Sequence, residues 1–369
     1  MTQDDRTKIL VLWADENSTN LGVQALAEGT RRLANLLAPG AEVSFRSYGG
    51  VNDRNLRLGA RSIAAALVGK NPALREWIAK FDLVIDTGAG DSFADIYGVR
   101  RLAEMSALRC LMTKVGVPFV MGPQTIGPFE RRLGRAIAAR SLRGATAVIG
   151  RDSVSAKRAE QIYGGRIILG SDVAFLIEQP EVGPRHDVVL NVSGLLWEKN
   201  PHVDYMFYRE SIYRLANAVL AQGRSLALLA HVVGTSDSDS DLHAVEEVRQ
   251  YLGNDVIVLQ PENVDSARSM LAGAQVVVAS RMHAALNALS TGVPAMAWAY
   301  SRKFGPLLGD IGWPHLIDLR TANSSIVDET MVFLDRVANG DIDANGVRKR
   351  SVNQFENLKE QFRVGGDIL

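Results

Sequence analysis

The sequence predicts an α/β fold of two Rossmann-like domains facing a cleft, and three observations support this class. The chain has 369 residues, which is more than one hydrophobic core usually supports. Short apolar, β-branched runs alternate with longer amphipathic segments throughout, as in parallel sheets with crossover helices. The alternation stops at a segment rich in proline and charge, residues 178–186, and then restarts. We interpret this segment as the linker between two open sheets.

The first predicted domain spans residues 1–180 and contains six strand patterns with helical patterns between them. The strand patterns are short and apolar, whereas the helical patterns repeat apolar residues every three to four positions. This alternation indicates a parallel sheet whose strands all end at one edge. The strands are expected at 8–14, 42–47, 82–87, 117–122, 145–150 and 166–170, and the helices at 22–38, 57–69, 99–115, 130–143 and 153–163.

The second predicted domain, residues 185–340, repeats the strand pattern and forms a second open sheet. Two helical patterns follow its last strand. Residues 341–369 are expected to form a C-terminal helix that packs back on the first domain. The strands are expected near 186–193, 225–231, 255–259, 275–280 and 293–299, and the final helices at 323–339 and 343–364.

The composition is that of an ordinary globular protein, with 47% hydrophobic and 22% charged residues. Its 41 basic residues balance 41 acidic ones, which argues against a protein that binds nucleic acid or a lipid surface as a whole. No apolar stretch approaches about eighteen residues, so no transmembrane segment is expected. The single cysteine, Cys110, lies in an apolar helical pattern, where a small buried side chain is expected. We therefore expect a cytoplasmic protein whose anion sites are local.

In open α/β sheets ligands bind beyond the carboxyl ends of the strands, so the loops there hold the candidate residues. After the first strand, a polar loop contains Asn17 and Asn20. After the strand at 82–87, a glycine turn is followed by Asp91 and Ser92. Carboxamide, carboxylate and hydroxyl groups of this kind can orient the hydroxyls of a sugar. The alternative for both loops is helix capping and turn formation.

Two other strand ends carry single charged or titratable candidates. Arg151 follows the strand at 145–150, and His231 ends the strand at 225–231 before an acidic loop. A lone histidine is more often structural than catalytic, and an acidic run can cap the next helix. The remaining histidines lack such a setting. Because no His/Cys/Asp cluster has the spacing of a zinc site, no metal is expected.

The strongest constellation follows the last two predicted strands. Arg281 and His283 occupy the first turn of the predicted helix, where free backbone N–H groups and the helix dipole favour an anion. Lys303 arrives with the following helix. Two cations and an imidazole beyond adjacent strand ends predict a small phosphate or carboxylate site. Both cations are expected outside the core, so replacing either should leave the fold intact, and ordinary surface charges are the alternative.

Several motifs, taken in their order along most of the chain, resemble the polysaccharide pyruvyl transferase family. The most specific is an Arg-Met-His triplet followed by a Gly-x-Pro strand and Tyr-x-x-Lys. The chain departs from the family at Met282, where leucine is usual, and at Ala89, which breaks a common triple-glycine turn. The motifs are NSTNLGVQAL, TGAGDSFADIYG, GPQTIGPF, RDSVS, GSDVAF, His231 with its acidic loop, and SRMHAALNALSTGVPAMAWAYSRKF.

The resemblance implies a glycosyltransferase-B-like architecture. It also implies transfer of the pyruvyl unit of phosphoenolpyruvate onto two hydroxyls of a saccharide acceptor, which forms a cyclic ketal. Phosphoenolpyruvate carries up to three negative charges, so its site needs clustered cations, and arginine suits both carboxylate and phosphate. We predict donor binding by Arg151, Arg281, Met282 and Lys303, acceptor binding by Asn17, Asn20, Asp91 and Ser92 opposite the cationic side, and acid–base catalysis by His283, with Asp91, Asp172 and His231 as alternative acids.

Phosphoenolpyruvate is a substrate in this chemistry, so no cofactor is expected. The acceptor can be free or lipid-linked, which leaves open peripheral contact with the inner face of a membrane. The sequence specifies no oligomeric state. Two alternatives share the fold: a glycosyltransferase that uses a nucleotide sugar, and an inactive relative that binds carbohydrate without turnover.

Overall fold

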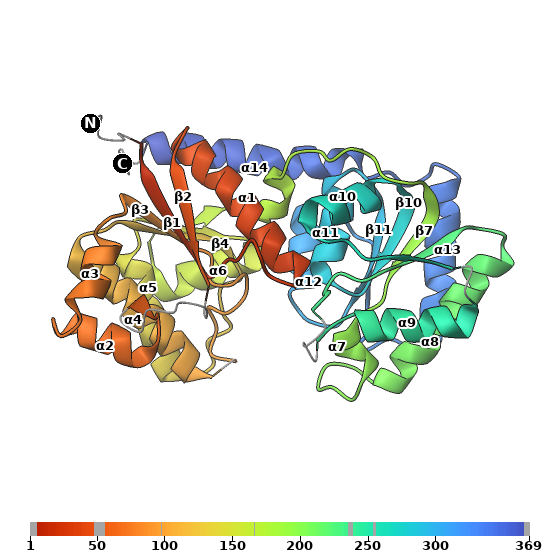
Figure 1. Ribbon diagram of the computed structural model, residues 1–369, viewed down its shortest axis with the longest axis horizontal. Coiled ribbons are helices and arrows are strands. Elements are labelled where there is room, and N and C mark those ends of the chain that lie inside the picture. Colours follow the sequence, from red (N-terminus) through yellow and green to blue (C-terminus); the bar gives the residue numbers. More distant parts are fainter. Residues whose placement is uncertain are drawn as a thin grey trace. The chain divides into compact units, whose positions relative to one another are not determined.

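Two parallel sheets of six strands each form the framework of the protein (Figure 1). The computed structural model describes residues 6–47, 56–96, 98–165, 167–234, 239–253 and 256–364. The chain divides into two compact units, and each contains one of the sheets. The first unit comprises Met1–Glu16, Leu26–Leu176 and Val352–Leu369, and the second comprises Asn17–Ala25 and Ile177–Ser351.

The first sheet has the strand order β2-β1-β3-β4-β5-β6, and all its strands are parallel. Parallel neighbours require crossover connections, which the helices supply. The strands are β1 (Lys8–Leu12), β2 (Glu42–Arg46), β3 (Leu83–Asp86), β4 (Phe119–Gln124), β5 (Ala147–Gly150) and β6 (Ile168–Leu169), and the helices are α1 (Leu21–Leu37), α2 (Ala60–Leu67), α3 (Pro72–Ile78), α4 (Val99–Val115), α5 (Arg132–Gly144) and α6 (Ser153–Tyr163).

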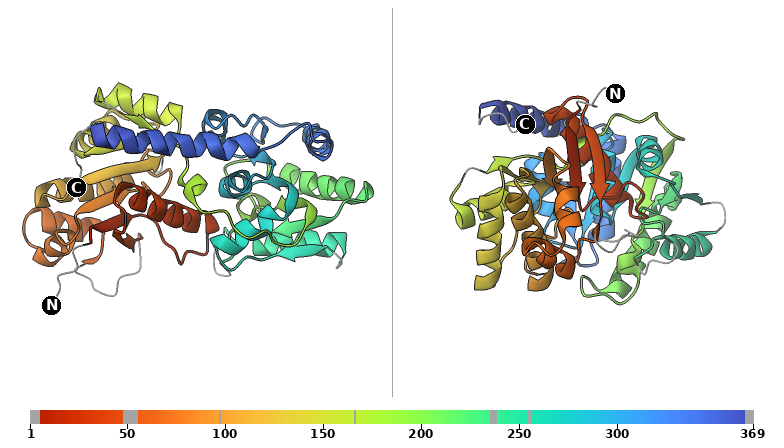
Figure 2. Two further views of the ribbon diagram at one scale, coloured as in Figure 1. Left: turned by 90° about the horizontal axis from the view of Figure 1, so that it is seen from above. Right: turned by 60° about the vertical axis from the view of Figure 1, so that its left-hand side comes forward.

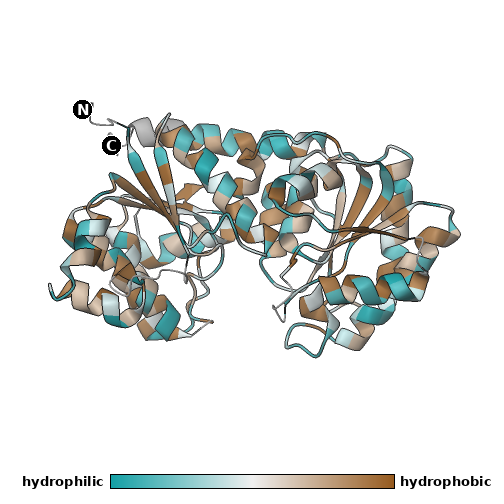
Figure 3. Cartoon of the chain, viewed as in Figure 1, coloured by the Kyte–Doolittle hydropathy of each residue, from teal (hydrophilic) through white to brown (hydrophobic). Residues whose placement is uncertain are grey.

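Alternating residues of the first sheet enter two different cores. Leu10 and Leu12 of β1 belong to the cluster that also contains residues of α2 to α5, whereas Ile9 and Val11 belong to the cluster that contains residues of α1. Figure 3 shows the strands of both sheets as mostly hydrophobic and the helices as two-sided. Phe355 of α14 (Asn345–Val364) is fully buried in the second of these clusters. In the left view of Figure 2 this helix, in blue, runs along the first sheet.

The second sheet has the order β12-β11-β10-β7-β8-β9. Counted within its unit this is the 3-2-1-4-5-6 order of the Rossmann fold, read from the other edge. The strands are β7 (His186–Asn191), β8 (Leu226–Leu229), β9 (Ile257–Leu259), β10 (Ala274–Ala279), β11 (Ala295–Ala299) and β12 (Leu316–Asp318), and the helices are α7 (Gly194–Trp197), α8 (Tyr205–Ala221), α9 (Leu242–Leu252), α10 (Val264–Ala272), α11 (Met282–Ser290), α12 (Phe304–Asp310) and α13 (Ile326–Ala338).

These strand orders confirm the predicted α/β class with two Rossmann-like sheets. They also locate the point in each sheet where the strand order reverses, which is where open α/β sheets bind ligands. In the first unit this point lies between β1 and β3, and in the second unit it lies between β7 and β10. The predictions missed α3 and β12, because seven and three residues are too few to show a periodicity.

Residues 17–25 belong to the second unit, although they lie near the start of the chain. The backbone of Asn20 pairs with Val232, which follows β8. The side chain of Gln24 donates to the Ser18 carbonyl (2.7 Å) and accepts from the N–H of Val264 (2.8 Å). The polar loop after β1 is therefore part of the second unit, whereas the sequence placed it within a first domain of residues 1–180.

Candidate functional site

The first turn of α11 lies at the reversal point of the second sheet, beside the carboxyl end of β7. The N–H of Arg281 donates to Oδ1 of Asn191, the last residue of β7 (2.8 Å). Ser280 precedes it, and its hydroxyl accepts from the Tyr208 hydroxyl (2.9 Å). No side chain caps α11, so the helix start presents backbone N–H groups at the edge where a ligand is expected.

Asp241 is a fully buried carboxylate that holds this region together. It accepts from Nε (3.1 Å) and Nη2 (2.7 Å) of Arg281, and from the backbone N–H groups of Gly194 (2.8 Å), His231 (2.9 Å) and Val232 (3.1 Å). Several charge-assisted hydrogen bonds to one buried group make it costly to remove any partner.

Arg281 is only 6% exposed, which corrects the expectation that it lies outside the core. A second carboxylate, Asp239, lies 2.9 Å from its Nη2. Burial acts to lower the pKa of Arg281, but Asp241 and Asp239 outweigh it, so that its pKa is raised. Arg281 is therefore a permanently charged group whose side chain is fixed by two carboxylates. A role in donor binding stays a prediction.

His283 packs against the first turn of α1 at Gly22. A Cβ added to this glycine would lie 2.7 Å from Nδ1 of His283 and 3.0 Å from its Cγ, so no larger residue fits without displacing the ring. The N–H of Gly22 donates to Oδ1 of Asn20 (3.0 Å), which makes that side chain a cap of α1. The N-terminal ends of α1 and α11 thus meet within one unit, and both helix dipoles favour negative charge there.

His231 is buried and uncharged at neutral pH. Burial, followed by the nearby His283 and Arg281, lowers its pKa to about 3. Its Nε2 lies 3.2 Å from Nδ2 of Asn287. A histidine with this pKa carries no proton to donate near neutrality, so His231 is a poor choice for the predicted acid. The acidic loop after it includes residues 235–238, which lie outside the described part of the chain.

The low pKa of His231 predicts that the protein loses stability in mild acid. The unfolded state takes up a proton at about pH 6.5, whereas the native state resists it until about pH 3. The contribution of His231 to the unfolding free energy is therefore fully present above pH 6.5 and is lost as the pH drops toward 3. Between pH 7 and 4.5 the wild type should lose about 2.5 kcal/mol more unfolding free energy than His231→Gln. Urea titrations of both proteins at the two pH values measure this difference, and equal losses would contradict it.

Lys303 lies near the same buried network. It is the N-cap residue of α12. The pKa of His202 is lowered by the burial of its own ring and by the positive charge of Lys303, whereas the negative charge of Asp239 acts to raise it. The ring of His202 also contacts Tyr300, with 5.4 Å between ring centroids. Since Asp239 also pairs with Arg281, the second unit brings Arg281, His202 and Lys303 into one neighbourhood.

Arg151 belongs to the first unit, where it follows β5 and is held by residues that follow β4 and β6. Its side chain is 2% exposed and pairs with Asp172 (Nη1 to Oδ2, 3.2 Å), while Nη2 donates to Thr125 Oγ1 (2.5 Å). Its backbone N–H donates to the carbonyl of Gln124 (3.1 Å). Arg151 and the predicted acid Asp172 thus form an ion pair with each other. A donor bound to Arg151 would compete with Asp172 for the guanidinium.

A second buried ion pair in this unit escaped the sequence analysis. Nε of Arg109 donates to Oδ2 of Asp86 (2.7 Å), and its guanidinium lies over the ring of Phe93, 4.4 Å from the centroid. The other Asp86 oxygen accepts from the N–H of Gly88 (2.9 Å). Asp86, a carboxylate at the end of an apolar strand pattern, was the only sign of this ion pair in the sequence. Its partner, Arg109, lies 23 residues away in a helix.

The glycine turn after β3 is built for close approach. Gly88 has φ +57°, and a Cβ there would lie 1.9 Å from Oε1 of Gln124. Ala89 follows with φ +50°, a conformation that alanine rarely adopts. Ser92 is buried and its N–H donates to the Gly88 carbonyl (2.8 Å), while Asp91 is half-buried.

The predicted site residues therefore fall into two groups. One group lies in the second unit. It includes Asn17 and Asn20, although the sequence predicted that these two residues lie opposite the cations. Met282 is buried, so only its backbone is available to a ligand. The second unit holds Asn17, Asn20, His231, Arg281, Met282, His283 and Lys303, and the first unit holds Asp91, Ser92, Arg151 and Asp172.

Among the described residues, no helix combines the length and apolarity that a membrane span requires. In the same residues, no group of three or more His, Cys, Asp and Glu side chains is placed to hold a metal ion.

Sequence comparison matches residues 20–302 to a family described as polysaccharide pyruvyl transferase. The chain is also 24% identical over 275 residues to the amylovoran biosynthesis protein AmsJ of Erwinia amylovora. That match covers 67% of this chain and 65% of the relative's own length. The family match runs from the polar loop at Asn20 through the α11 first turn and ends one residue before Lys303.

Two solved structures cover nearly the whole chain. Alr3699/HepE of Anabaena, in complex with UDP and glucose, matches with a TM-score of 0.54 at 12% identity, over 97% of this chain and 99% of that one. The UDP-GlcNAc 2-epimerase of Neisseria meningitidis, bound to UDP-GlcNAc, matches with a TM-score of 0.56 at 9% identity, over 97% and 100%. At these identities the likeness concerns the fold, which is the glycosyltransferase-B-like type.

Proposed function

Because the chain belongs to the polysaccharide pyruvyl transferase family, we propose that it transfers the pyruvyl group of phosphoenolpyruvate to a sugar as a cyclic ketal. The reaction would serve the biosynthesis of a polysaccharide or glycolipid. The observation that carries this proposal is the α11 first turn at the reversal point of the second sheet, where Arg281 contacts the end of β7 and His283 contacts the start of α1.

The donor would bind through its charges. Phosphoenolpyruvate carries a phosphate and a carboxylate on few atoms, and an uncapped helix N-terminus stabilises such an anion. Arg281 contributes a guanidinium that two carboxylates hold in place, and Lys303 contributes an ammonium nearby. The backbone N–H of Met282 is the natural further donor in this turn. Arg151, in the first unit, is assigned to the donor by the family pattern alone.

The chemistry needs an acid and then a base. A proton is added to the methylene carbon of the donor, and one sugar hydroxyl attacks the central carbon. The bond from that carbon to the phosphate oxygen breaks, phosphate leaves, and a second hydroxyl closes the ketal. The two hydroxyl protons end on the new methyl group and on phosphate, so no redox step occurs. His283 is the proposed acid–base group, because its imidazole lies in the first turn of α11 and an imidazole can both give and take a proton.

The acceptor sugar is assigned to the hydroxyl and carboxylate groups of the first unit. Asp91 and Ser92 follow the strained turn after β3, where backbone and ligand can approach closely. In the second unit the side chain of Asn20 caps α1, and Asn17 of the same loop is exposed to solvent. A lipid-linked acceptor would bring a cytoplasmic enzyme to the inner face of the membrane.

Ligand-dependent melting tests this function directly. Phosphoenolpyruvate at about a hundred times its Kd should add roughly 2.7 kcal/mol to the unfolding free energy and raise the melting temperature. Lys303→Ala should weaken donor binding about tenfold or more, since it removes a charge-assisted contact worth about 1.5–3 kcal/mol. Arg302→Ala, which removes the neighbouring cation, serves as the matched control. Ketal formation is then followed by the new methyl signal of the product.

Two outcomes would replace the proposal. Stabilisation by UDP-glucose or UDP-GlcNAc with no response to phosphoenolpyruvate would indicate a glycosyltransferase. Binding of glycans without any release of phosphate would indicate a carbohydrate-binding relative.

A further inference from the structure

A pocket lies in the first unit, near the amino ends of the strands and therefore at the opposite edge of this sheet from Asp91 and Arg151. Both α4 and α5 begin near the carboxyl ends of the strands and end near the amino ends, because each leads into the next parallel strand. The C-terminal halves of these helices line the pocket together with Phe119, the first residue of β4, and Leu67 of α2. Its volume is about 560 Å³, within the range of small-molecule sites.

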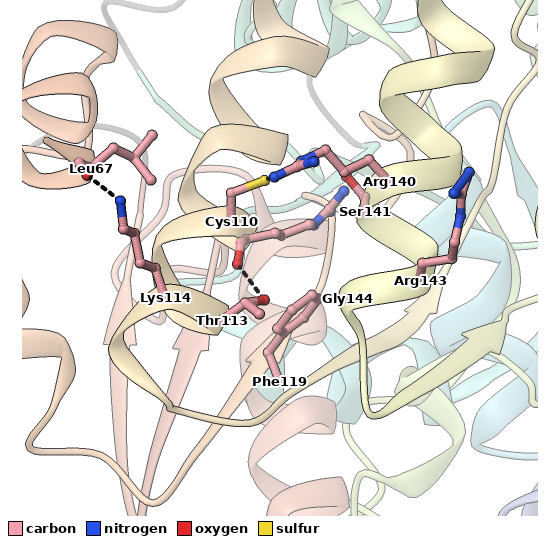
Figure 4. Close-up of a pocket in the computed structure, with 10 residues that line it drawn as sticks. Leu67, Cys110, Thr113, Lys114, Phe119, Arg140, Ser141, Arg143 and Gly144 are labelled. Atoms are coloured by element: carbon pink, nitrogen blue, oxygen red, sulfur yellow. Dashed lines mark hydrogen bonds between the residues drawn. The ribbon is translucent and has the colours of Figure 1, made fainter.

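The polar lining of the pocket is cationic. Lys114, Arg140 and Arg143 line it, and no aspartate or glutamate does. Arg109 also lines it, but its guanidinium is engaged with Asp86, so we do not count its charge. Figure 4 shows Lys114 on one side, Arg143 on the other, Arg140 reaching toward the thiol of Cys110, and the Phe119 ring at the base.

The three cations have no carboxylate partner within the described ranges. Nζ of Lys114 donates to the carbonyl of Leu67 (2.9 Å), Nε of Arg143 donates to that of Ala139 (3.2 Å), and Nε of Arg140 contacts Sγ of Cys110 (3.1 Å). The remaining guanidinium N–H groups of both arginines are therefore available to a ligand. This differs from Arg109, Arg151 and Arg281, each of which has a buried carboxylate beside it.

The helix that supplies both arginines is basic along its whole exposed face. Residues 131–144 contain five arginines and no acidic residue, and all five are exposed. In a chain whose charges cancel overall, this is a local excess that water and salt must otherwise screen. The pocket adjoins this basic segment at Arg140 and Arg143, and its lining is apolar where Leu67 and Phe119 contribute.

We propose that this pocket binds a small anion that carries a phosphate or diphosphate group, with an apolar portion resting on Phe119 and Leu67. Two arginines and a lysine within one cavity favour a ligand with at least two negative charges, and the guanidinium fork matches phosphate oxygens in pairs. The same chemistry is offered by a soluble phosphorylated metabolite and by a phospholipid headgroup. The pocket is distinct from Arg151, the donor candidate of the same unit, because Phe119 begins β4 whereas Arg151 follows the carboxyl end of β5.

The single cysteine of the chain provides a direct measure of occupancy, because Cys110 lines the pocket and is partly exposed. The full-length protein is alkylated with uncharged N-ethylmaleimide at constant ionic strength, with and without inorganic pyrophosphate. At ten times its Kd, pyrophosphate should slow alkylation about tenfold, because only the unoccupied pocket reacts. A parallel series uses vesicles of phosphatidylglycerol, with vesicles of phosphatidylcholine as the neutral reference.

Two double variants separate the pocket from the basic face around it. Arg140→Gln with Arg143→Gln removes two lining cations, and the ratio of rates with and without ligand should return to about one. Arg131→Gln with Arg132→Gln removes two exposed arginines at the other end of the same helix segment and should keep the protection. All four positions are exposed, so the melting temperatures should match the wild type.

Protection by pyrophosphate supports the proposal with a soluble ligand, and protection by anionic vesicles alone supports it with a lipid headgroup. The proposal is overturned if neither slows alkylation. It is equally overturned if protection survives in the Arg140/Arg143 variant, or if the Arg131/Arg132 variant loses it to the same extent, since binding would then be diffuse.

Discussion

Replacing His283 with glutamine is expected to lower turnover by about 10²- to 10⁴-fold at saturating donor. Glutamine keeps a hydrogen-bonding group but cannot move a proton between pH 5 and 9. The ring lies against Gly22 with no space for a Cβ, so its position is fixed by two helix starts. A bound donor with up to three negative charges favours the protonated ring, and the reaction needs that proton at the methylene carbon.

The measurement is a pH–rate profile of the wild type and His283→Gln, with phosphate release as the readout. The exposed His243 of α9 supplies a matched control, and His243→Gln should leave the profile unchanged. If His283→Gln loses less than about tenfold and keeps the wild-type profile, His283 only positions the donor. Asp91 and Asp172 would then be the remaining acids, because the low pKa of His231 argues against it.

Arg281→Ala is expected to destabilise the second unit by about 3–5 kcal/mol, in addition to any effect on the donor. The substitution leaves Asp241 fully buried with two of its hydrogen bonds removed and no opposing charge. Three backbone N–H groups still point at that carboxylate, but they do not replace a guanidinium. Arg281→Lys should lose less, because it keeps the charge without the paired geometry.

Urea unfolding at pH 7 measures both variants. Arg320→Ala is the control, since Arg320 pairs with Asp318 at the surface, where such pairs contribute about 0–1 kcal/mol. Equal stability of Arg281→Ala and Arg320→Ala would contradict the central role given to Asp241. A double variant, Arg281→Ala with Asp241→Asn, should recover part of the loss because the unpaired charge is gone.

The sequence patterns were sufficient for the fold and for the edge of each sheet at which the candidate residues lie. Strand ends follow from local apolar runs, and in parallel sheets those ends gather at one edge. For this reason the α11 first turn could be selected from residues 280–283 alone. The strand order of the first sheet could not be derived, because it depends on which crossover each helix makes and not on any local pattern.

The electrostatic partners of the site residues were also beyond the sequence. Arg281 and Asp241 are 40 residues apart, and nothing local distinguishes a cation that will be buried beside a carboxylate from one that will meet solvent. The pattern at Arg281 therefore predicted an anion-binding cation outside the core, whereas the side chain is buried. Likewise, Asn20 precedes a helix of the first half, and only the tertiary pairing with Val232 assigns it to the second unit.

That assignment has a consequence for how the chain folds during synthesis. Neither unit is a continuous piece of polypeptide, since the second needs residues 17–25 and the first needs residues 352–364. At about 5–20 residues per second, the α14 residues that complete the first core leave the ribosome on the order of ten to thirty seconds after Leu176. Phe355 and Leu358 fill that core. Until they are synthesised, the apolar residues that they cover in the first unit stay exposed to solvent. Fragments cut at residue 176 should consequently fold poorly when each is produced alone. Co-expression of the two fragments should restore folding better than separate production.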